Sequence, residues 1–214
     1  MALKTFNTDR KQIIKAEPLT PDSFREFGGV ISADYQINES NDKSNANYGT
    51  AIKVHKVAPI INNYANSKSK QKETANWNIF RCKAPTHLIK HGGLNSVYLS
   101  KVLERHLYTT QTFIPMGQDS KKISYLVIVA KTDESTSQRL PTPDKIKAFV
   151  CKGNQSVTYG PGIWHAPMVV IDETIPYLDF AVMIHENGVA DEDCQECYFD
   201  PGFNIQYQLD NSKL

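Results

Sequence analysis

The type and setting of His165 suit proton transfer or metal binding. This residue follows the turn Gly160-Pro161-Gly162, in which glycine tolerates positive φ and proline fixes φ at about −65°, so the chain should hold the imidazole rigidly. On a strand, alternation puts His165 and the apolar Trp164 on opposite faces. His165 is therefore either a proton carrier or metal ligand in a site, or a core histidine whose two nitrogens are bound by backbone groups.

A second histidine belongs to a spaced set of possible ligands. Glu104, His106 and Gln111 copy the spacing of the cupin motif H-x-H-x(3,4)-E, with Glu and Gln at two of its positions, and the turn before His165 resembles a later cupin motif. Two imidazoles with oxygen ligands can hold a divalent metal, although Gln is a poor ligand for most such ions. These residues leave open a metal site at Glu104, His106, Gln111 and His165, or a metal-free cupin site.

Further cations stand on two expected strands. In NYGTAIKVHKVAPI, alternation places Lys53 and His55 on the same face, beside Ala51. They are either site residues or the polar side of an exposed edge strand. Arg81 lies beside apolar residues in a strand expected over residues 77–82.

The spacing and the neighbours of the cysteines do not favour a redox or zinc site. Of the four, only Cys194 and Cys197 form a C-x-x-C pair, whereas a structural zinc site normally takes four ligands in two such clusters. Their acidic neighbours in ADEDCQECYFD disfavour a thiolate. We expect both to be surface or packing thiols that turnover does not need.

Composition narrows the class of partner. The 214 residues contain 24 Lys and Arg against 23 Asp and Glu, a net charge of +1 that gives no general attraction to nucleic acid or to an anionic membrane, so we expect neither partner. The chain starts without the apolar run of a signal peptide and holds no run as long as a membrane span, so the expected location is cytoplasmic. The sequence also lacks G-x-G-x-x-G, a P-loop and G-x-S-x-G, which removes support for dinucleotide, nucleotide and serine-hydrolase functions.

Many short strands joined by Gly and Pro turns must position these residues. A helix is expected from Pro21 to Phe27, capped by Thr20 and ended by Gly28-Gly29. Strands are expected at residues 29–31, 124–130, 146–151, 155–159, 163–171 and 178–184, while 95–103 fits a strand or a helix. Polar loops are expected at about 36–47, 62–75 and 131–144, and a C-terminal tail at about 201–214. The pattern predicts one mainly β domain over residues 1–214, a cupin-like jelly-roll β barrel with a few short helices.

Several longer segments resemble one enzyme family. LERHLYTTQTFIPMG, IKAFVCKGNQSVTYGPGIWHAPM and DEDCQE look like signature blocks of the ureidoglycolate lyases, cupin-like enzymes of allantoin breakdown, and NYGTAIKVH and FRCKAP resemble the upstream blocks. The matches extend from about Pro18 to Asp200. Bacterial members tend to have a second histidine directly after the position of His165, where this chain has Ala166, so no role of that imidazole carries over. Extra residues in the loops and tail resemble a fungal-type member.

The resemblance implies a lyase that cleaves ureidoglycolate to glyoxylate and urea in purine catabolism. Release of urea requires a base at the hydroxyl and an acid at the leaving nitrogen, roles that histidine fills near neutral pH without an organic cofactor. A divalent metal stays open. The implied catalytic residues are His106, His165 and Lys53, and the implied substrate-binding residues are Asn47, His55, Arg81, Gln111 and Tyr159.

Two other functions fit the same residues. An amidohydrolase acting on ureidoglycolate would release ammonia and carbon dioxide instead of urea, and a non-catalytic cupin would only bind a small carboxylate. The resemblance and the exposed strand edges also predict a homodimer.

Overall fold

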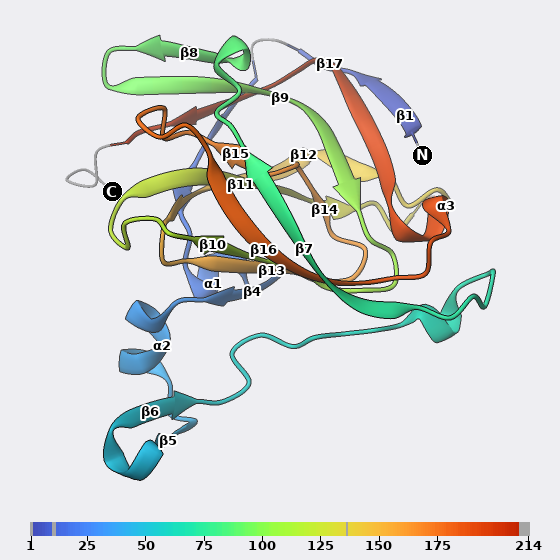
Figure 1. The fold of residues 1–214 in the computed structure, drawn as a ribbon. Helices are drawn as coiled ribbons and strands as arrows, with labels where there is room; N and C mark the ends of the chain where they lie inside the picture. The colour runs from blue at the N-terminus through green and yellow to red at the C-terminus, as the bar shows by residue number, and fades with distance from the viewer. Residues whose placement is uncertain (1, 10–11, 136, 210–214) are drawn as a thin grey trace.

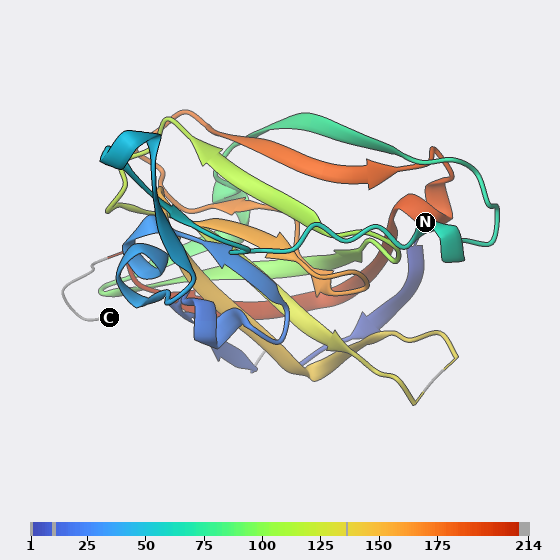
Figure 2. The same cartoon turned by 90° about the horizontal axis from the view of Figure 1, so that it is seen from below.

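Two packed β-sheets make up most of the protein. The computed structural model describes residues 2–9, 12–135 and 137–209 and divides most strands between a ten-stranded and a five-stranded sheet (Figures 1 and 2). The larger sheet has the order β1-β17-β9-β14-β11-β12-β3, with β15 beside β11, β2 beside β17 and β8 beside β9. The smaller has the order β4-β13-β10-β16-β7. Two such sheets are the arrangement of a jelly roll, so the expected mainly β, cupin-like fold is confirmed.

The strands range from two residues to thirteen. The ten-stranded sheet contains β1 (Ala2–Asn7), β2 (Ile13–Lys15), β3 (Glu17–Pro18), β8 (Ile89–Gly92), β9 (Asn95–Arg105), β11 (Ile123–Thr132), β12 (Pro141–Lys152), β14 (Trp164–His165), β15 (Val169–Val170) and β17 (Gln195–Tyr207). The five-stranded sheet contains β4 (Gly28–Ile31), β7 (Thr74–Cys82), β10 (Gln111–Met116), β13 (Ser156–Tyr159) and β16 (Leu178–Glu186).

The core lies on both faces of β11, the buried apolar strand that the sequence predicts. Val127 and Val129 pack between the two sheets, in a cluster that includes Phe113 of β10. Leu126 and Ile128 point the opposite way and pack in a second cluster with side chains of β9 and β17. A strand buried on both faces is apolar throughout because successive side chains alternate between the faces.

The expected first helix begins where its cap predicts. α1 (Pro21–Phe24) follows Thr20, whose hydroxyl accepts a hydrogen bond from the Ser23 backbone N–H at 3.0 Å, while the Ser23 hydroxyl accepts one from the Thr20 N–H at 3.1 Å. This reciprocal pair is a capping box. Phe24 is fully buried against Phe149 and Tyr159, so the cap fixes a side chain that supports the inter-sheet core.

The prediction of a polar loop at residues 36–47 is wrong for most of that segment. α2 (Ala33–Glu39) and β5 (Lys43–Ala46) occupy this segment. The Gln36 side-chain oxygen accepts from the Ser32 N–H at 2.6 Å, and its NH2 group donates to the Val30 carbonyl at 2.7 Å. A polar side chain thus closes the start of the helix, so polarity did not indicate a loop here.

Other boundaries also differ from expectation. β11 continues to Thr132 and β12 starts at Pro141, which shortens the loop expected at 131–144. Residues 163–171 form two short strands, β14 and β15, instead of one. Residues 95–103 are a strand, and residues 201–207 belong to β17 paired with β9, not to a tail. Residues 210–214 of the expected tail lie outside the described residues.

A hairpin extends away from the two sheets. β5 and β6 (Ala51–Val54) form a separate two-stranded sheet, connected by the 3-10 turn η1 (Asn47–Gly49). Figure 1 shows this hairpin at the lower left, reached through α2 and leaving through a long extended segment. We call residues 41–60 the arm.

Membrane-spanning potential is absent from the helices. Among the described residues, no helix is both long and apolar enough to cross a bilayer.

Candidate active site

The structure brings His106 and His165 together where the strands of both sheets meet. His106 directly follows β9 and His165 ends β14, which pairs with β9 through His165 and Glu104. The two imidazole centroids lie 5.4 Å apart. Gln111, the first residue of β10 in the other sheet, completes the cluster.

His106 is oriented by a backbone carbonyl. Its Nδ1–H donates to the Asp193 carbonyl at 2.6 Å, which leaves Nε2 as the nitrogen with a lone pair. This Nε2 is buried and has no partner at hydrogen-bond geometry among the described residues, although the side chain of Gln111 interacts with the imidazole and works to raise its pKa. Burial lowers the pKa of His106, and the neighbouring His165 lowers it further, so the neutral imidazole is favoured.

His165 is almost fully buried and faces oxygen atoms. Its Nδ1–H donates to the Ile163 carbonyl at 3.0 Å. Its Nε2 lies 3.1 Å from Gln111 Oε1 and 3.6 Å from Glu104 Oε1. Only one of its nitrogens is bound by the backbone, so the alternative of a core histidine satisfied by two backbone groups is wrong.

Glu104 supplies the negative charge of the cluster. Burial works to raise its pKa, but the hydrogen bond and charge of His165, together with the charge of His106, outweigh burial and lower the pKa below its ordinary value. An ionised carboxylate therefore faces His165 Nε2. At 3.6 Å the two groups attract each other as an ion pair when the imidazole is protonated, while the hydrogen-bond partner of Nε2 is Gln111.

The cluster also fits a divalent metal ion. Ligand atoms of Glu104, His106 and His165 all lie within 4.8 Å of one another, and Gln111 Oε1 is next to His165. The lone pair on His106 Nε2 is buried and without a hydrogen-bond partner among the described residues, and a metal ion would satisfy it as a ligand atom. Two imidazoles and a carboxylate suit a borderline transition metal, with the amide oxygen of Gln111 as a weaker fourth ligand.

Tyr159 forms one wall of the cluster. Its ring stacks on His165 with centroids 4.0 Å apart and planes 10° apart. Its hydroxyl is buried, and no hydrogen-bond partner for it occurs within the described part of the chain. Phe24 of α1 packs on the same ring, which links the first helix to the site.

Three of the expected site residues lie on the arm instead. Asn47 begins η1, and Lys53 and His55 lie on or just after β6. Lys53 is exposed, and His55 Nε2 lies 2.9 Å from the hydroxyl of Ser44 on the opposite strand. The arm of a chain therefore does not bring these residues to that chain's own histidine pair.

Arg81 lies at the opposite end of the smaller sheet from Gln111. It pairs with Asp179 through two 2.9 Å hydrogen bonds and stacks on Tyr177 at 3.9 Å. Asp179 is opposite Met116 of β10, five residues along the strand from Gln111, which corresponds to about 17 Å. Arg81 is already engaged far from the histidines.

The groups that support His106 could not be recognised from the sequence. Asp193, at the end of α3 (Ala190–Asp193), accepts from Tyr64 Oη at 2.5 Å and from the N–H groups of Asn187 and Gly188 at 2.9 and 2.7 Å. These bonds hold the carbonyl that orients the imidazole. The acidic run ADEDCQE was the available signal, but a backbone carbonyl leaves no mark in a sequence.

Arg105 faces away from the cluster. Its guanidinium stacks on Trp164 at 4.4 Å, and its Nε donates to Gln195 Oε1 at 3.0 Å. Burial lowers the pKa of Arg105 to about 10. This neighbour of two site residues therefore acts as packing on the other side of β9.

The cysteines are thiols, as expected. Cys197 is fully buried in the core and Cys194 is half-buried. Burial raises the pKa of Cys194 to about 12 and that of Cys197 to about 11, which disfavours the reactive thiolate. That turnover does not need them stays a prediction.

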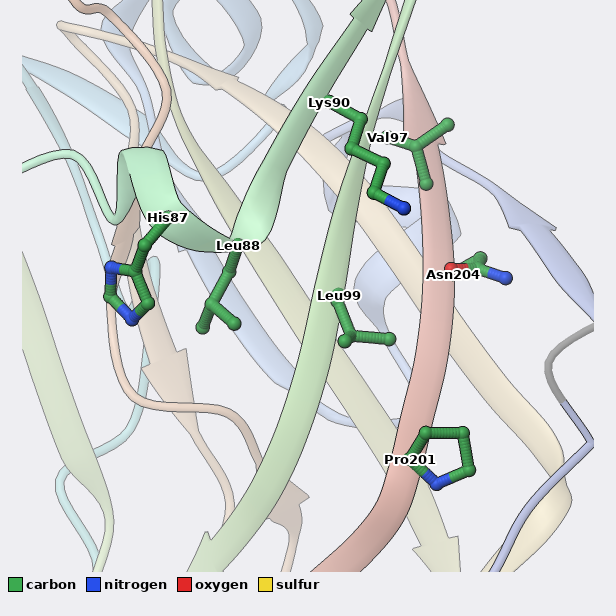
Figure 3. Close-up of a pocket in the computed structure, with 7 residues that line it drawn as sticks. All are labelled: His87, Leu88, Lys90, Val97, Leu99, Pro201 and Asn204. Atoms are coloured by element: carbon green, nitrogen blue, oxygen red, sulfur yellow. The ribbon is translucent and has the colours of Figure 1, made fainter.

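A separate groove lies over β8, β9 and β17 of the larger sheet. Figure 3 shows its lining, which includes Lys90, Leu99 and Asn204, around a volume of about 310 Å³. Leu99 precedes Glu104 by five residues on β9, or about 17 Å. The groove is therefore distinct from the histidine cluster.

The chain is similar to one family along nearly its whole length. The family model described as ureidoglycolate lyase matches residues 11–206. The ureidoglycolate lyase of Saccharomyces cerevisiae is 42% identical over 197 residues, covering 88% of this chain and 95% of that protein. That of Schizosaccharomyces pombe is 40% identical over 183 residues, covering 85% and 89%. That of Pseudomonas fluorescens is 28% identical over 184 residues, covering 86% and 90%.

The residues matched by the family model include Glu104, His106, Gln111 and His165. The resemblance inferred from the sequence blocks is confirmed, and the chain belongs to the ureidoglycolate lyase family.

Proposed function

We propose that this protein cleaves ureidoglycolate to glyoxylate and urea. The observation that carries the proposal is the pair of buried imidazoles, one presenting a lone pair and the other facing a carboxylate. This pair suits a reaction that removes one proton and delivers another. The family relationship supplies the substrate.

The reaction needs two proton transfers at one carbon. That carbon carries a hydroxyl, a carboxylate and the ureido nitrogen. When the hydroxyl proton goes to a base, its oxygen forms the C=O bond of glyoxylate and the C–N bond breaks. The leaving nitrogen then takes a proton from an acid and departs as urea, so atoms and charge balance without a redox cofactor.

His106 is the better candidate for the base. Its Nδ1–H is committed to the Asp193 carbonyl, so Nε2 is the accepting nitrogen. Its lowered pKa keeps that nitrogen unprotonated at neutral pH.

His165 is the better candidate for the acid. Its Nδ1–H is committed to Ile163, and its Nε2 lies 3.1 Å from Gln111 Oε1 and 3.6 Å from Glu104 Oε1, oxygens that can orient a proton on this nitrogen. Tyr159, stacked on the ring, restricts its orientation.

A metal bound by Glu104, His106, Gln111 and His165 would polarise the substrate hydroxyl as a Lewis acid. In that case the same side chains serve as ligands. The protein's own contribution is then to fix them by the backbone bonds of the two imidazoles.

The remaining polar groups serve substrate binding in this proposal. Gln111 and Tyr159 border the two imidazoles and can hydrogen-bond the ureido group. Asn47, His55 and Lys53 are the further candidates, with Lys53 for the carboxylate. Arg81, engaged by Asp179, is the weaker candidate for the carboxylate.

We further propose that the enzyme works as a homodimer in the cytoplasm. The unpartnered hairpin of the arm supports association of two chains. The four cysteine thiols suit a reducing compartment.

A product assay tests the reaction. Purified protein given ureidoglycolate should release glyoxylate and urea in equal amounts without nucleotide or flavin. Ammonia in place of urea would indicate an amidohydrolase, and binding without turnover a ligand-binding cupin.

The first prediction concerns His165→Ala. We expect kcat to fall at least about 100-fold, the size typical of lost acid–base catalysis, with an unchanged circular dichroism spectrum. His91→Ala is the matched control, because His91 is exposed on β8 and pairs with Glu173. Chelation followed by metal add-back separates the two roles, since only a metal site loses activity and then regains it.

A further inference from the structure

The arm has almost no interior of its own. All of residues 41–60 are exposed or only half-buried. Tyr48 is fully exposed, and Ile52 and Ile60 are 51% and 61% exposed. A two-stranded hairpin by itself is marginally stable in water, so one that displays apolar side chains requires a surface to pack on.

The backbone conformation of the arm also indicates that it packs on another surface. Asn47, Tyr48 and Lys56 have φ values of 50°, 55° and 52°, in the left-handed region that side chains rarely adopt. Such residues persist where their surroundings determine the conformation. In a single chain the surroundings of the arm are mostly solvent.

The histidine cluster has the complementary deficiency. Its substrate in the proposed function is an anion, yet the Glu104 carboxylate that faces the imidazoles is negatively charged. Arg105, the cation next to it in sequence, is bound by Gln195, and Arg81 is bound by Asp179 at the far end of the smaller sheet. Lys53 is exposed on the arm, on the same face as His55.

A second copy of this chain offers the matching surface. The outer face of the smaller sheet exposes Trp77 and Ile79 of β7, 65% and 66% exposed, and Met116 of β10. Trp77 is opposite Met183 and Met183 is opposite Thr112, next to Gln111. This apolar surface thus borders the strand end that carries a site residue. Two-fold symmetry would let each arm use the same surface of the other copy.

We propose that the arm of one chain packs on a second copy and completes its active site, with Lys53 binding the substrate carboxylate of the partner's site. The substrate part of this inference rests on the proposed function. The exchange makes two equivalent shared sites per dimer.

Mixed dimers test the exchange directly. Lys53→Ala and His165→Ala chains carrying different tags are co-expressed, and the heterodimer is isolated by two affinity steps. If arms are exchanged, the intact arm of the His165→Ala chain serves the intact histidines of the Lys53→Ala chain. One of the two sites is then complete, and the heterodimer should show about half of wild-type activity per dimer. Both homodimers should show at most a few per cent.

The controls separate the possible failures. Lys43→Ala, on the opposite strand of the arm, should retain wild-type activity, because Lys43 faces the Ile37 carbonyl within its own chain. In sedimentation equilibrium, the wild type should be a dimer, and replacing residues 43–54 by a Gly-Ser linker should weaken the dimer at least tenfold. A monomeric wild type, or a heterodimer no more active than its parents, overturns the exchange. A wild type that releases no urea overturns the proposed function instead.

Discussion

At the scale of single residues, His106 and His165 are held alike and surrounded differently. Each donates Nδ1–H to a backbone carbonyl. The Nε2 of His106 then has no partner at hydrogen-bond geometry among the described residues, while that of His165 meets oxygen atoms of Glu104 and Gln111. The two imidazoles therefore differ in their surroundings, and the proposed division into base and acid rests on that difference.

The lowered pKa of His106 predicts how stability depends on pH. In the unfolded chain the imidazole takes up a proton near its ordinary value of 6.5, whereas in the folded protein it does so only at lower pH. As pH falls below about 6.5, the unfolded state binds more protons than the folded state does. The free energy of unfolding should therefore decrease as pH decreases from about 7 to 5. Urea denaturation across this range should show a shallower decrease for His106→Gln. An equal slope in both proteins would contradict the lowered pKa.

The buried hydroxyl of Tyr159 predicts opposite effects on stability and substrate binding. Tyr159→Phe removes an unsatisfied buried hydroxyl, so the free energy of unfolding of the substrate-free protein should increase by about 1 kcal/mol. If the substrate pairs with that hydroxyl, KM should rise about fivefold with kcat nearly unchanged, as the loss of one hydrogen bond of about 1 kcal/mol implies.

Tyr125→Phe is the control for this change. The Tyr125 hydroxyl donates to the Gln155 carbonyl, so its removal should lower stability and leave KM unaltered. A Tyr159→Phe protein with unchanged KM would make Tyr159 a packing residue alone.

Much of the cluster could be predicted from residue spacing, since a Gly-Pro-Gly turn fixes the position of His165 and the interval from Glu104 to Gln111 follows a known pattern. The orientation of His106 could not. It depends on the Asp193 carbonyl, and a main-chain group is present at every position whatever the side chain.

At the scale of elements, α1 is a short helix with influence on the site. Its capping box positions Phe24, Phe24 packs on Tyr159, and Tyr159 stacks on His165. The helix thus supports the imidazole of His165 through two aromatic contacts.

Thr20→Ala tests that support. Loss of the cap should reduce the free energy of unfolding by about 1 kcal/mol, whereas Thr20→Ser keeps the hydroxyl and should cost much less. Thermal unfolding of the two variants measures the difference. If both unfold at the wild-type temperature, the capping box does not stabilise the helix.

Local patterns predicted the apolar elements better than the polar ones. β11 is apolar along its length, so its burial could be inferred from sequence. α2 could not, because its start depends on hydrogen bonds of Gln36 to Ser32 and Val30. The second half of β17 is a strand because it pairs with β9, about a hundred residues earlier, and such pairing carries little local signal.

At the scale of the whole molecule, the two sheets meet where the site lies. The larger sheet contributes β9 and β14, and the smaller contributes β10 and β13. Two pairs of consecutive strands, β9 with β10 and β13 with β14, therefore fix a cluster a few ångströms across. The mainly β class followed from the many short strands and turns, but the division into two sheets required the long-range pairings.

The exposed arm carries a consequence for how activity scales with the amount of enzyme. If each site borrows Lys53 from another molecule, turnover per chain must vanish on dilution below the dissociation constant of the pair, and the rate there must rise with the square of the protein concentration. Initial rates measured over a thousandfold dilution series should show this change of order. Wherever the enzyme is present below that dissociation constant, a twofold fall in its concentration would then lower the total rate about fourfold.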